Sequence, residues 1–166
     1  MNALHIVENA LLVAFVVTVM VTDWRWRRIP NLVTYPAMVA GLALGAMEGL
    51  GAPFQSGFLD HLTGLALAFI VSYPFYAGGG MKAGDAKLLM SVGALRGALF
   101  LLPAAFYGAL IGGVVALIFL VARRLAPVRP GEGPRTMRGL LHTWIPYGVA
   151  LGAGALVALL VELTAP

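Results

Sequence analysis

The sequence contains no cysteine among its 166 residues. Disulfide frameworks, cysteine-based zinc sites and thiol catalysis are therefore excluded. Charge is also scarce, because only 11% of the residues are Asp, Glu, Lys or Arg, whereas soluble domains carry about 25%. No run of aromatics and arginines suggests base stacking, because the basic residues cluster between hydrophobic runs, where a membrane protein keeps them. These absences exclude an ordinary soluble domain and argue against a nucleic-acid-binding protein.

Apolar residues make up 60% of the chain and fall into long runs. The runs lie near 3–22, 32–50, 58–77, 86–102, 104–122 and 143–163. A helix needs about 20 apolar residues to span a bilayer. We therefore predict an all-α, polytopic membrane protein with about six transmembrane helices, formed as a single domain over residues 1–166. The first run is read as a retained span, because residues 1–9 lack the Lys or Arg of a signal peptide.

One boundary between the predicted spans is open. Residues 85–124 have the length of two spans without a strong break, and we place the division near Leu102-Pro103. The alternative break is Arg96-Gly97, which would make the fourth helix short.

Basic residues gather in alternate connections between the apolar runs. Arginines follow the first run at 25–28, Lys82 and Lys87 surround the start of the fourth, and more arginines occupy 123–139. Basic loops face the cytoplasm. The pattern predicts a multi-pass protein of the cytoplasmic (inner) membrane with its N-terminus outside. The Pro-, Gly- and Arg-rich segment 123–139 is expected to be a flexible cytoplasmic loop within the domain.

Two of the seven acidic residues are candidates for chemistry. The others occupy predicted helix ends or loops: Glu8, Glu48, Asp60, Glu132 and Glu162. Asp23 closes the first span and Asp85 opens the fourth, so the predicted topology places both at the cytoplasmic boundary. An ionisable residue at membrane depth suggests a functional site. Taken singly, either aspartate could instead cap a helix or pair with a nearby cation.

The three histidines give no sign of a metal site. His5, His61 and His142 lie in different predicted loops and helix ends. We expect them to have separate structural roles and not to converge. No metal and no cofactor are therefore predicted.

Three segments together carry a family resemblance. They read Asp-Trp-Arg-Trp-Arg-Arg-Ile-Pro-Asn at 23–31, Gly-Gly-Gly-Met-Lys-Ala-Gly-Asp-Ala-Lys-Leu-Leu at 78–89, and Ile-Pro-Tyr-Gly-Val-Ala-Leu-Gly-Ala-Gly at 145–154. In this order and topology, the chain resembles the prepilin peptidases, the membrane aspartic peptidases of type IV prepilins and preflagellins. It is most similar to the short, single-domain form associated with tight-adherence (Flp-type) pili, and the resemblance covers nearly the whole chain.

The resemblance implies a catalytic pair, Asp23 and Asp85. It also implies supporting motif residues: Arg28, Ile29, Pro30, Asn31, Gly84, Lys87, Pro146, Tyr147 and Gly148. The family's Gly-x-Gly-Asp motif has one departure here, because Lys82 replaces its first glycine. Larger, bifunctional members carry an insert with paired cysteines and also methylate the new N-terminus, and neither feature is present.

The expected function is therefore a membrane aspartic endopeptidase. It would remove the short basic leader of a prepilin at the cytoplasmic face of the bilayer, without N-methyltransferase activity. Two alternatives are a non-catalytic membrane subunit of a pilus or secretion assembly and a small proton-coupled transporter that uses Asp23 or Asp85. The transporter fits less well, since no internal repeat is visible and both aspartates lie at one edge.

Overall fold

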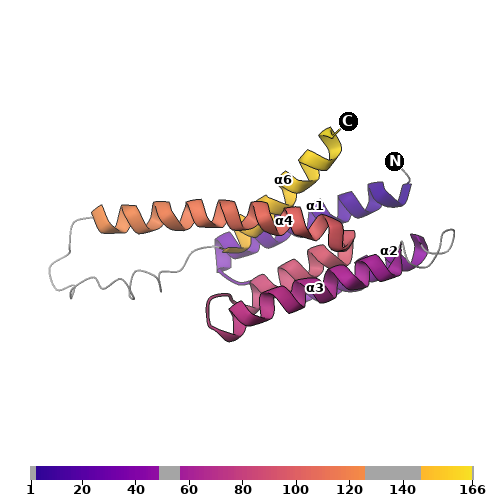
Figure 1. The fold of residues 1–166 in the computed structure, drawn as a ribbon, viewed down its shortest axis with the longest axis horizontal. Coiled ribbons are helices and arrows are strands. Elements are labelled where there is room, and N and C mark those ends of the chain that lie inside the picture. The colour runs from indigo at the N-terminus through magenta and orange to yellow at the C-terminus, as the bar shows by residue number, and fades with distance from the viewer. Residues whose placement is uncertain (1–2, 49–56, 126–146, 166) are drawn as a thin grey trace.

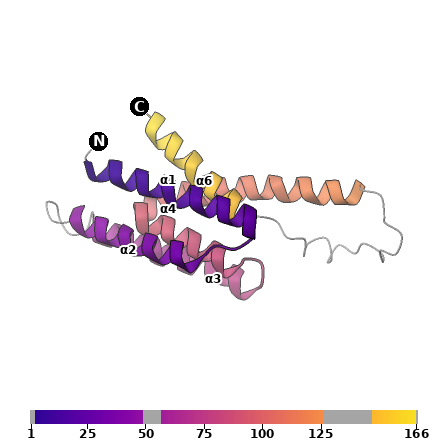
Figure 2. The ribbon, with the colours of Figure 1, turned by 180° about the vertical axis from the view of Figure 1, so that it is seen from behind.

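A computed structural model describes residues 3–48, 57–125 and 147–165, and all regular structure in those ranges is helical. The helices are α1 (Ala3–Trp26), α2 (Asn31–Glu48), α3 (Phe58–Ala77), α4 (Ala83–Leu125) and α6 (Tyr147–Thr164). They form an elongated bundle, seen from both sides in Figures 1 and 2. Four of them, α1, α3, α4 and α6, are long and apolar enough to cross a membrane. The prediction of a helical membrane protein is confirmed.

Large apolar side chains cover the outside of the bundle. Val39, Ile70 and Leu99 are 68%, 65% and 81% exposed. A water-soluble protein rarely shows so much contiguous apolar surface. This apolar outer surface is suited to contact with the lipid of a membrane.

The helix α4 is broken at Gly97, where φ is 77° and ψ is 179°. This left-handed backbone conformation favours glycine. A side chain at Gly97 would also collide with the Asp60 carboxylate. Asp60 Oδ1 accepts a hydrogen bond from the Ala98 N–H at 3.2 Å, just after the break. The division predicted near Leu102-Pro103 is thus wrong, and the alternative at Arg96-Gly97 is the observed one.

Apart from the break in α4, the described helix boundaries lie within about four residues of the apolar runs. The third run is reproduced as α3, whereas α1 extends four residues beyond its predicted end at residue 22, to Trp26. Of the expected loop 123–139, residues 123–125 belong to α4. The rest of that loop, together with Pro146, lies outside the described residues.

Successive elements run in opposite directions, which gives the bundle two distinct ends. The end of α1 and the starts of α2, α4 and α6 meet at one end, which we name the aspartate end because it contains Asp23 and Asp85 (Figure 1). The start of α1, the end of α2 and the start of α3 meet at the other. We name it the histidine end, because it contains His5 and His61. The buried apolar core, including Leu12, Leu88 and Leu95, fills the space inside the helices.

Candidate active site

The two predicted aspartates come together at the aspartate end. Asp23 lies in the last turns of α1 and Asp85 in the first turn of α4. Each is only 4% exposed. Both line a cavity of about 240 Å³, and Asp85 lies within the electrostatic range of the Asp23 carboxylate. Residues 62 positions apart in sequence thus form one buried acidic pair.

The start of α6 holds Asp23 in place. The backbone N–H groups of Gly148 and Val149 donate hydrogen bonds to the Asp23 carboxylate. The first N–H groups of a helix have no partner within the helix, and its N-terminus favours negative charge. A Cβ atom at Gly148 would lie 2.7 Å from Asp23 Oδ2. Only glycine at this position leaves room for the carboxylate.

Asp85 is fixed by its own helix. Its backbone N–H donates to the Lys82 carbonyl at 3.1 Å, and its side chain accepts a hydrogen bond from the Lys82 N–H. A side chain at the third helical position that accepts a hydrogen bond from the N–H of the residue before the helix is one half of a capping box. Asp85 therefore has a defined orientation as α4 begins.

Each carboxylate keeps one oxygen available for chemistry. Asp23 Oδ2 and Asp85 Oδ2 are buried and have no hydrogen-bond partner within the described ranges. The charge of Lys82, the residue that replaces the motif glycine, acts on both carboxylates. Two close carboxylates cannot both ionise easily, so such a pair tends to hold one shared proton. A pair in that state can act as an acid and a base at once.

The segment after α1 contacts the start of α4 through four of the predicted motif residues. Ile29 packs on Gly84, where an added Cβ would lie 3.2 Å from Ile29 Cβ. Lys87 Nζ donates to Asn31 Oδ1 at 2.8 Å and lies 5.1 Å from the centroid of the Tyr35 ring. These contacts hold the segment that follows Asp23 against the start of α4, which contains Asp85.

The remaining motif residues have separate positions. Arg28 lines the cavity beside the acidic pair. The Pro30 carbonyl accepts the Val33 N–H at 3.1 Å as α2 begins. Tyr147 opens α6 but does not line the cavity, and its ring lies next to Gly112. Arg27, with φ of 56°, ends α1 by donating its N–H to the Asp23 carbonyl at 3.0 Å.

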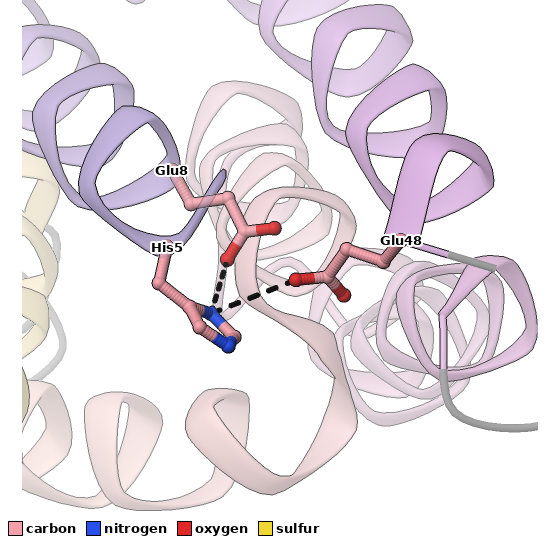
Figure 3. Close-up of side chains that lie close together, drawn as sticks. All are labelled: His5, Glu8 and Glu48. Carbon is pink, nitrogen blue, oxygen red and sulfur yellow. Dashed lines mark hydrogen bonds and ion pairs between the residues drawn. The ribbon is translucent and has the colours of Figure 1, made fainter. Parts of the chain in front are cut away.

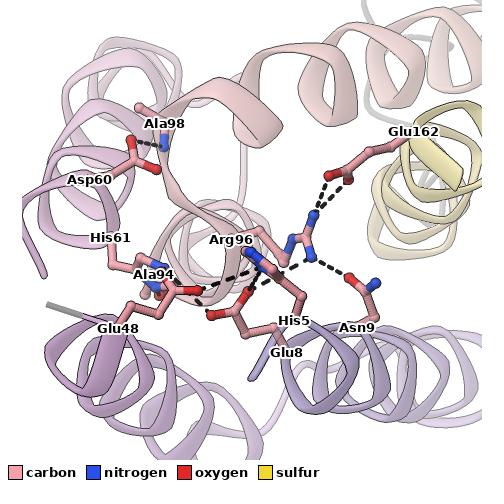
Figure 4. A network of polar contacts seen from close by, with 10 residues as sticks. All are labelled: His5, Glu8, Asn9, Glu48, Asp60, His61, Ala94, Arg96, Ala98 and Glu162. Carbon is pink, nitrogen blue, oxygen red and sulfur yellow. Dashed lines mark hydrogen bonds and ion pairs between the residues drawn. The ribbon is translucent and has the colours of Figure 1, made fainter. Parts of the chain in front are cut away.

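A second polar cluster, which the sequence analysis missed, lies at the histidine end (Figure 4). Side chains from all five described helices contribute to it: His5, Glu8, Asn9, Glu48, Asp60, His61, Arg96 and Glu162. The prediction that the histidines do not converge is wrong for His5 and His61, and His142 lies outside the described residues. Because successive helices are antiparallel, the start of α1, the end of α2 and the start of α3 must meet. The sequence did contain a signal for this cluster. The predicted topology, with the N-terminus outside, puts Glu8, Glu48 and Asp60 at the same outer boundary of the membrane.

Comparison with known proteins places this architecture among leader peptidases. The chain is 32% identical over 116 residues to a prepilin leader peptidase/N-methyltransferase from Xanthomonas campestris pv. campestris, covering 68% of this chain and 40% of that protein. It is 25% identical over 159 residues to a protein of the same name from Bacillus subtilis, covering 95% of this chain and 57% of that protein. The chain thus spans about half the length of these curated relatives, and no solved structure matches it. The model of the type IV leader peptidase family matches residues 10–117, a range that includes both aspartates. The chain belongs to the type IV leader peptidase family.

Proposed function

We propose that this protein is a membrane aspartic endopeptidase that removes the leader peptide of a type IV prepilin. The observation that carries the proposal is the buried pair of Asp23 and Asp85, each with one oxygen that has no hydrogen-bond partner among the described residues. Six membrane crossings follow if the two halves of α4, 83–96 and 98–125, count as separate spans beside α1, α2, α3 and α6.

The proposed reaction uses both carboxylates and one water molecule. The ionised aspartate takes a proton from the water, which attacks the scissile carbonyl, while the protonated aspartate donates its proton to the carbonyl oxygen. Collapse of the tetrahedral intermediate breaks the C–N bond and transfers a proton to the leaving amine. General acid–base help of this kind contributes about 10²- to 10⁴-fold. Arg27, Arg28 and Lys82 line the same cavity, and their positive charges favour the one negative charge that the aspartate pair and substrate share during the reaction.

The position of the site fits a substrate that enters from the cytoplasmic side. Trp24 and Trp26, 72% and 62% exposed, lie at the end of α1 beside Arg25 and Arg27. Exposed tryptophans favour the membrane interface, and arginines favour its cytoplasmic side. With the aspartate end at the cytoplasmic boundary of the inner membrane, the pair meets the junction between a short basic leader and the hydrophobic helix of a prepilin. Flp-type prepilins are the proposed substrates, on the resemblance to the short form of the family.

The proposal includes cleavage without methylation. The 166 residues contain none of the cysteines that the resemblance associates with the methyltransferase insert. The mass of the cleaved pilin tests this point, since methylation of the new N-terminal amine adds about 14 Da per methyl group and is not expected.

Co-expression with a prepilin tests the peptidase. We expect leader removal by the wild type and its loss, by at least about a hundredfold, in Asp23→Asn and Asp85→Asn. Glu162→Gln is a matched control, because it neutralises a carboxylate at the opposite end of the bundle. Immunoblots of membrane fractions would show that all variants insert equally.

The two aspartates are judged separately in this assay. Undiminished cleavage by either Asn variant would remove that residue from the catalytic pair. No cleavage by the wild type of any Flp-type prepilin would favour the assembly-subunit alternative.

A further inference from the structure

The polar cluster at the histidine end takes no part in the proposed peptidase chemistry, yet its charges are arranged as a site. It borders a cavity of about 410 Å³. His5 and Glu8 come from α1, Glu48 ends α2 and His61 lies in the first turn of α3 (Figure 4). The side chains of Glu8 and His61 are 3% and 4% exposed, so both are well shielded from solvent.

Fixed positive charge balances these carboxylates only in part. Among the described residues, Arg96 is the one Lys or Arg that lines the cavity. Its shortest contacts are elsewhere: its Nη2 lies 2.6 Å from both carboxylate oxygens of Glu162, and its Nη1 donates to Asn9. Arg96 Nη1 also forms a longer ion pair with Glu8 Oε2, at 3.8 Å. Glu8 and Glu48 therefore bring more negative charge into this space than Arg96 balances, which is costly without a further counter-charge.

His61 directs its unprotonated ring nitrogen toward those two carboxylates. Its Nδ1 lies 2.7 Å from the Ala94 carbonyl oxygen, which can only accept, so Nδ1 carries the proton. In the neutral ring, Nε2 then presents a lone pair to Glu8 Oε1 at 3.8 Å and to Glu48 Oε2 at 3.7 Å. Glu8 Oε1 is buried without a hydrogen-bond partner among the described residues.

His5 completes the arrangement from the opposite side. Its Nδ1 lies 3.2 Å from Glu8 Oε2 and 3.6 Å from Glu48 Oε1. One ligand atom from each of His5, Glu8 and Glu48 can be chosen so that all lie within 4.8 Å of one another (Figure 3). Metal–ligand bonds of 2.0–2.2 Å at tetrahedral angles separate neighbouring ligand atoms by about 3.3–3.6 Å. The two separations from His5 Nδ1, 3.2 and 3.6 Å, are close to that range.

We propose that His5, Glu8 and Glu48 bind a divalent transition-metal ion at the histidine end. His61 Nε2 faces the other oxygen of each glutamate and helps to position the two carboxylates. The mixed imidazole and carboxylate donors select against Mg²⁺ and Ca²⁺, which prefer oxygen ligands alone, and suit Zn²⁺. A 2+ ion also neutralises the charges of the two glutamates. Bound there, the ion ties together α1 and α2 at the end of the bundle remote from the aspartates.

The test uses the full chain, purified in detergent with an affinity tag that contains no histidine. After treatment with EDTA and its removal, Zn²⁺ alone is added, and bound metal is counted by mass spectrometry after dialysis. We expect about one Zn²⁺ per chain and a higher thermal unfolding midpoint with Zn²⁺ than without it. Glu8→Gln and His5→Gln should each weaken Zn²⁺ binding at least tenfold. His5 is the safer variant for folding, because its side chain is 50% exposed.

Two control variants show whether the ion is held by the proposed ligands or elsewhere on the chain. His142→Gln removes the remaining histidine of the chain, and Asp23→Asn disables the proposed peptidase. Both should retain Zn²⁺, so the metal site and the peptidase are tested independently. The proposal is overturned if the wild type retains no Zn²⁺, or if Glu8→Gln and His5→Gln bind it as tightly as the wild type. It is also overturned if acidification stabilises the protein and Zn²⁺ does not, because protonated histidines would then balance the glutamates.

Discussion

At the scale of single residues, the acidic pair depends on its neighbours as much as on its own carboxylates. Gly148 gives Asp23 both a backbone donor and the space in which the carboxylate lies. Gly84, the residue before Asp85, likewise leaves space for the Ile29 side chain. Glycine is favoured at both positions by close approach, since a methyl group would displace the Asp23 carboxylate or the Ile29 side chain.

Gly148→Ala tests this dependence. The added Cβ would lie 2.7 Å from Asp23 Oδ2, so the carboxylate must move by a substantial fraction of an ångström. Misplacement of a reacting group by 1 Å costs about a hundredfold in rate. We expect the initial rate of leader removal to fall by about ten- to a hundredfold, with normal insertion in the membrane.

Gly113→Ala is the matched control, because no atom lies within 4 Å of the added methyl group. It should cleave at the wild-type rate. Equal activity of the two alanine variants would show that Asp23 does not need its observed position.

At the scale of helices, the break in α4 decides where Asp85 lies. A helix over 83–96 is about 21 Å long, whereas the apolar core of a bilayer is about 30 Å thick. A segment so short spans the core only where the bilayer is thinned or where its start lies below the headgroups. If the protein cleaves prepilins as proposed, either arrangement would bring Asp85 and its cavity close to the end of the substrate helix.

The first half of α4 is also the most closely packed element. Gly93 approaches Gly64 of α3, and Gly41 of α2 approaches the backbone of Ala94. A Cβ atom at any of these glycines would overlap the backbone of the neighbouring helix. Glycine-rich contacts of this kind let transmembrane helices meet closely.

Gly93→Ala should therefore destabilise the bundle. The methyl group would collide with the Gly64 carbonyl, which cannot rotate away as a side chain can. Overpacking of this type costs about 1–3 kcal/mol. Unfolding in mixed micelles, followed by circular dichroism, measures the change, and Gly113→Ala again provides the reference. A stability equal to that of the reference would contradict the observed contact between α3 and α4.

At the scale of the whole molecule, two polar clusters occupy opposite ends of an apolar bundle. Asp23 and Asp85 lie at one end, and the histidine cluster lies at the other, next to both described chain ends (Figure 1). The two aspartates, Glu8 and His61 are buried within the bundle, whose outer surface carries many exposed apolar side chains. Because the two ends differ, the orientation of the bundle in the membrane can be tested by asking which end faces the cytoplasm.

Cysteine labelling tests that orientation directly. The wild-type chain has no cysteine, so it gives no background. We expect Ala3→Cys to react with a membrane-impermeant maleimide on intact spheroplasts, and Leu125→Cys to react only after permeabilisation. Leu125 is 79% exposed at the end of α4. The reverse pattern would place the aspartate end outside and exclude cleavage of a cytoplasmic leader.

Much of the fold could be predicted from the sequence, because helix formation and membrane insertion are local. Apolar runs set the helices, and the boundaries of α3 agree with the run that predicted it. The break at Gly97 could not be chosen over Leu102-Pro103, because it depends on Asp60, a residue 37 positions earlier that contacts the next amide. Proline is the stronger local signal, but the tertiary contact decided the position.

The sequence by itself determined that this protein is helical, apolar and equipped with two unusual aspartates, since these follow from composition, periodicity and motif. Only the tertiary structure decided that Gly148 and Val149 hold Asp23, that Asn31 meets Lys87, and that His5 and His61 face the same two glutamates. Such contacts join residues from different helices, and their geometry depends on how the helices pack. Local sequence specifies each helix, whereas a site built between helices exists only once they have assembled.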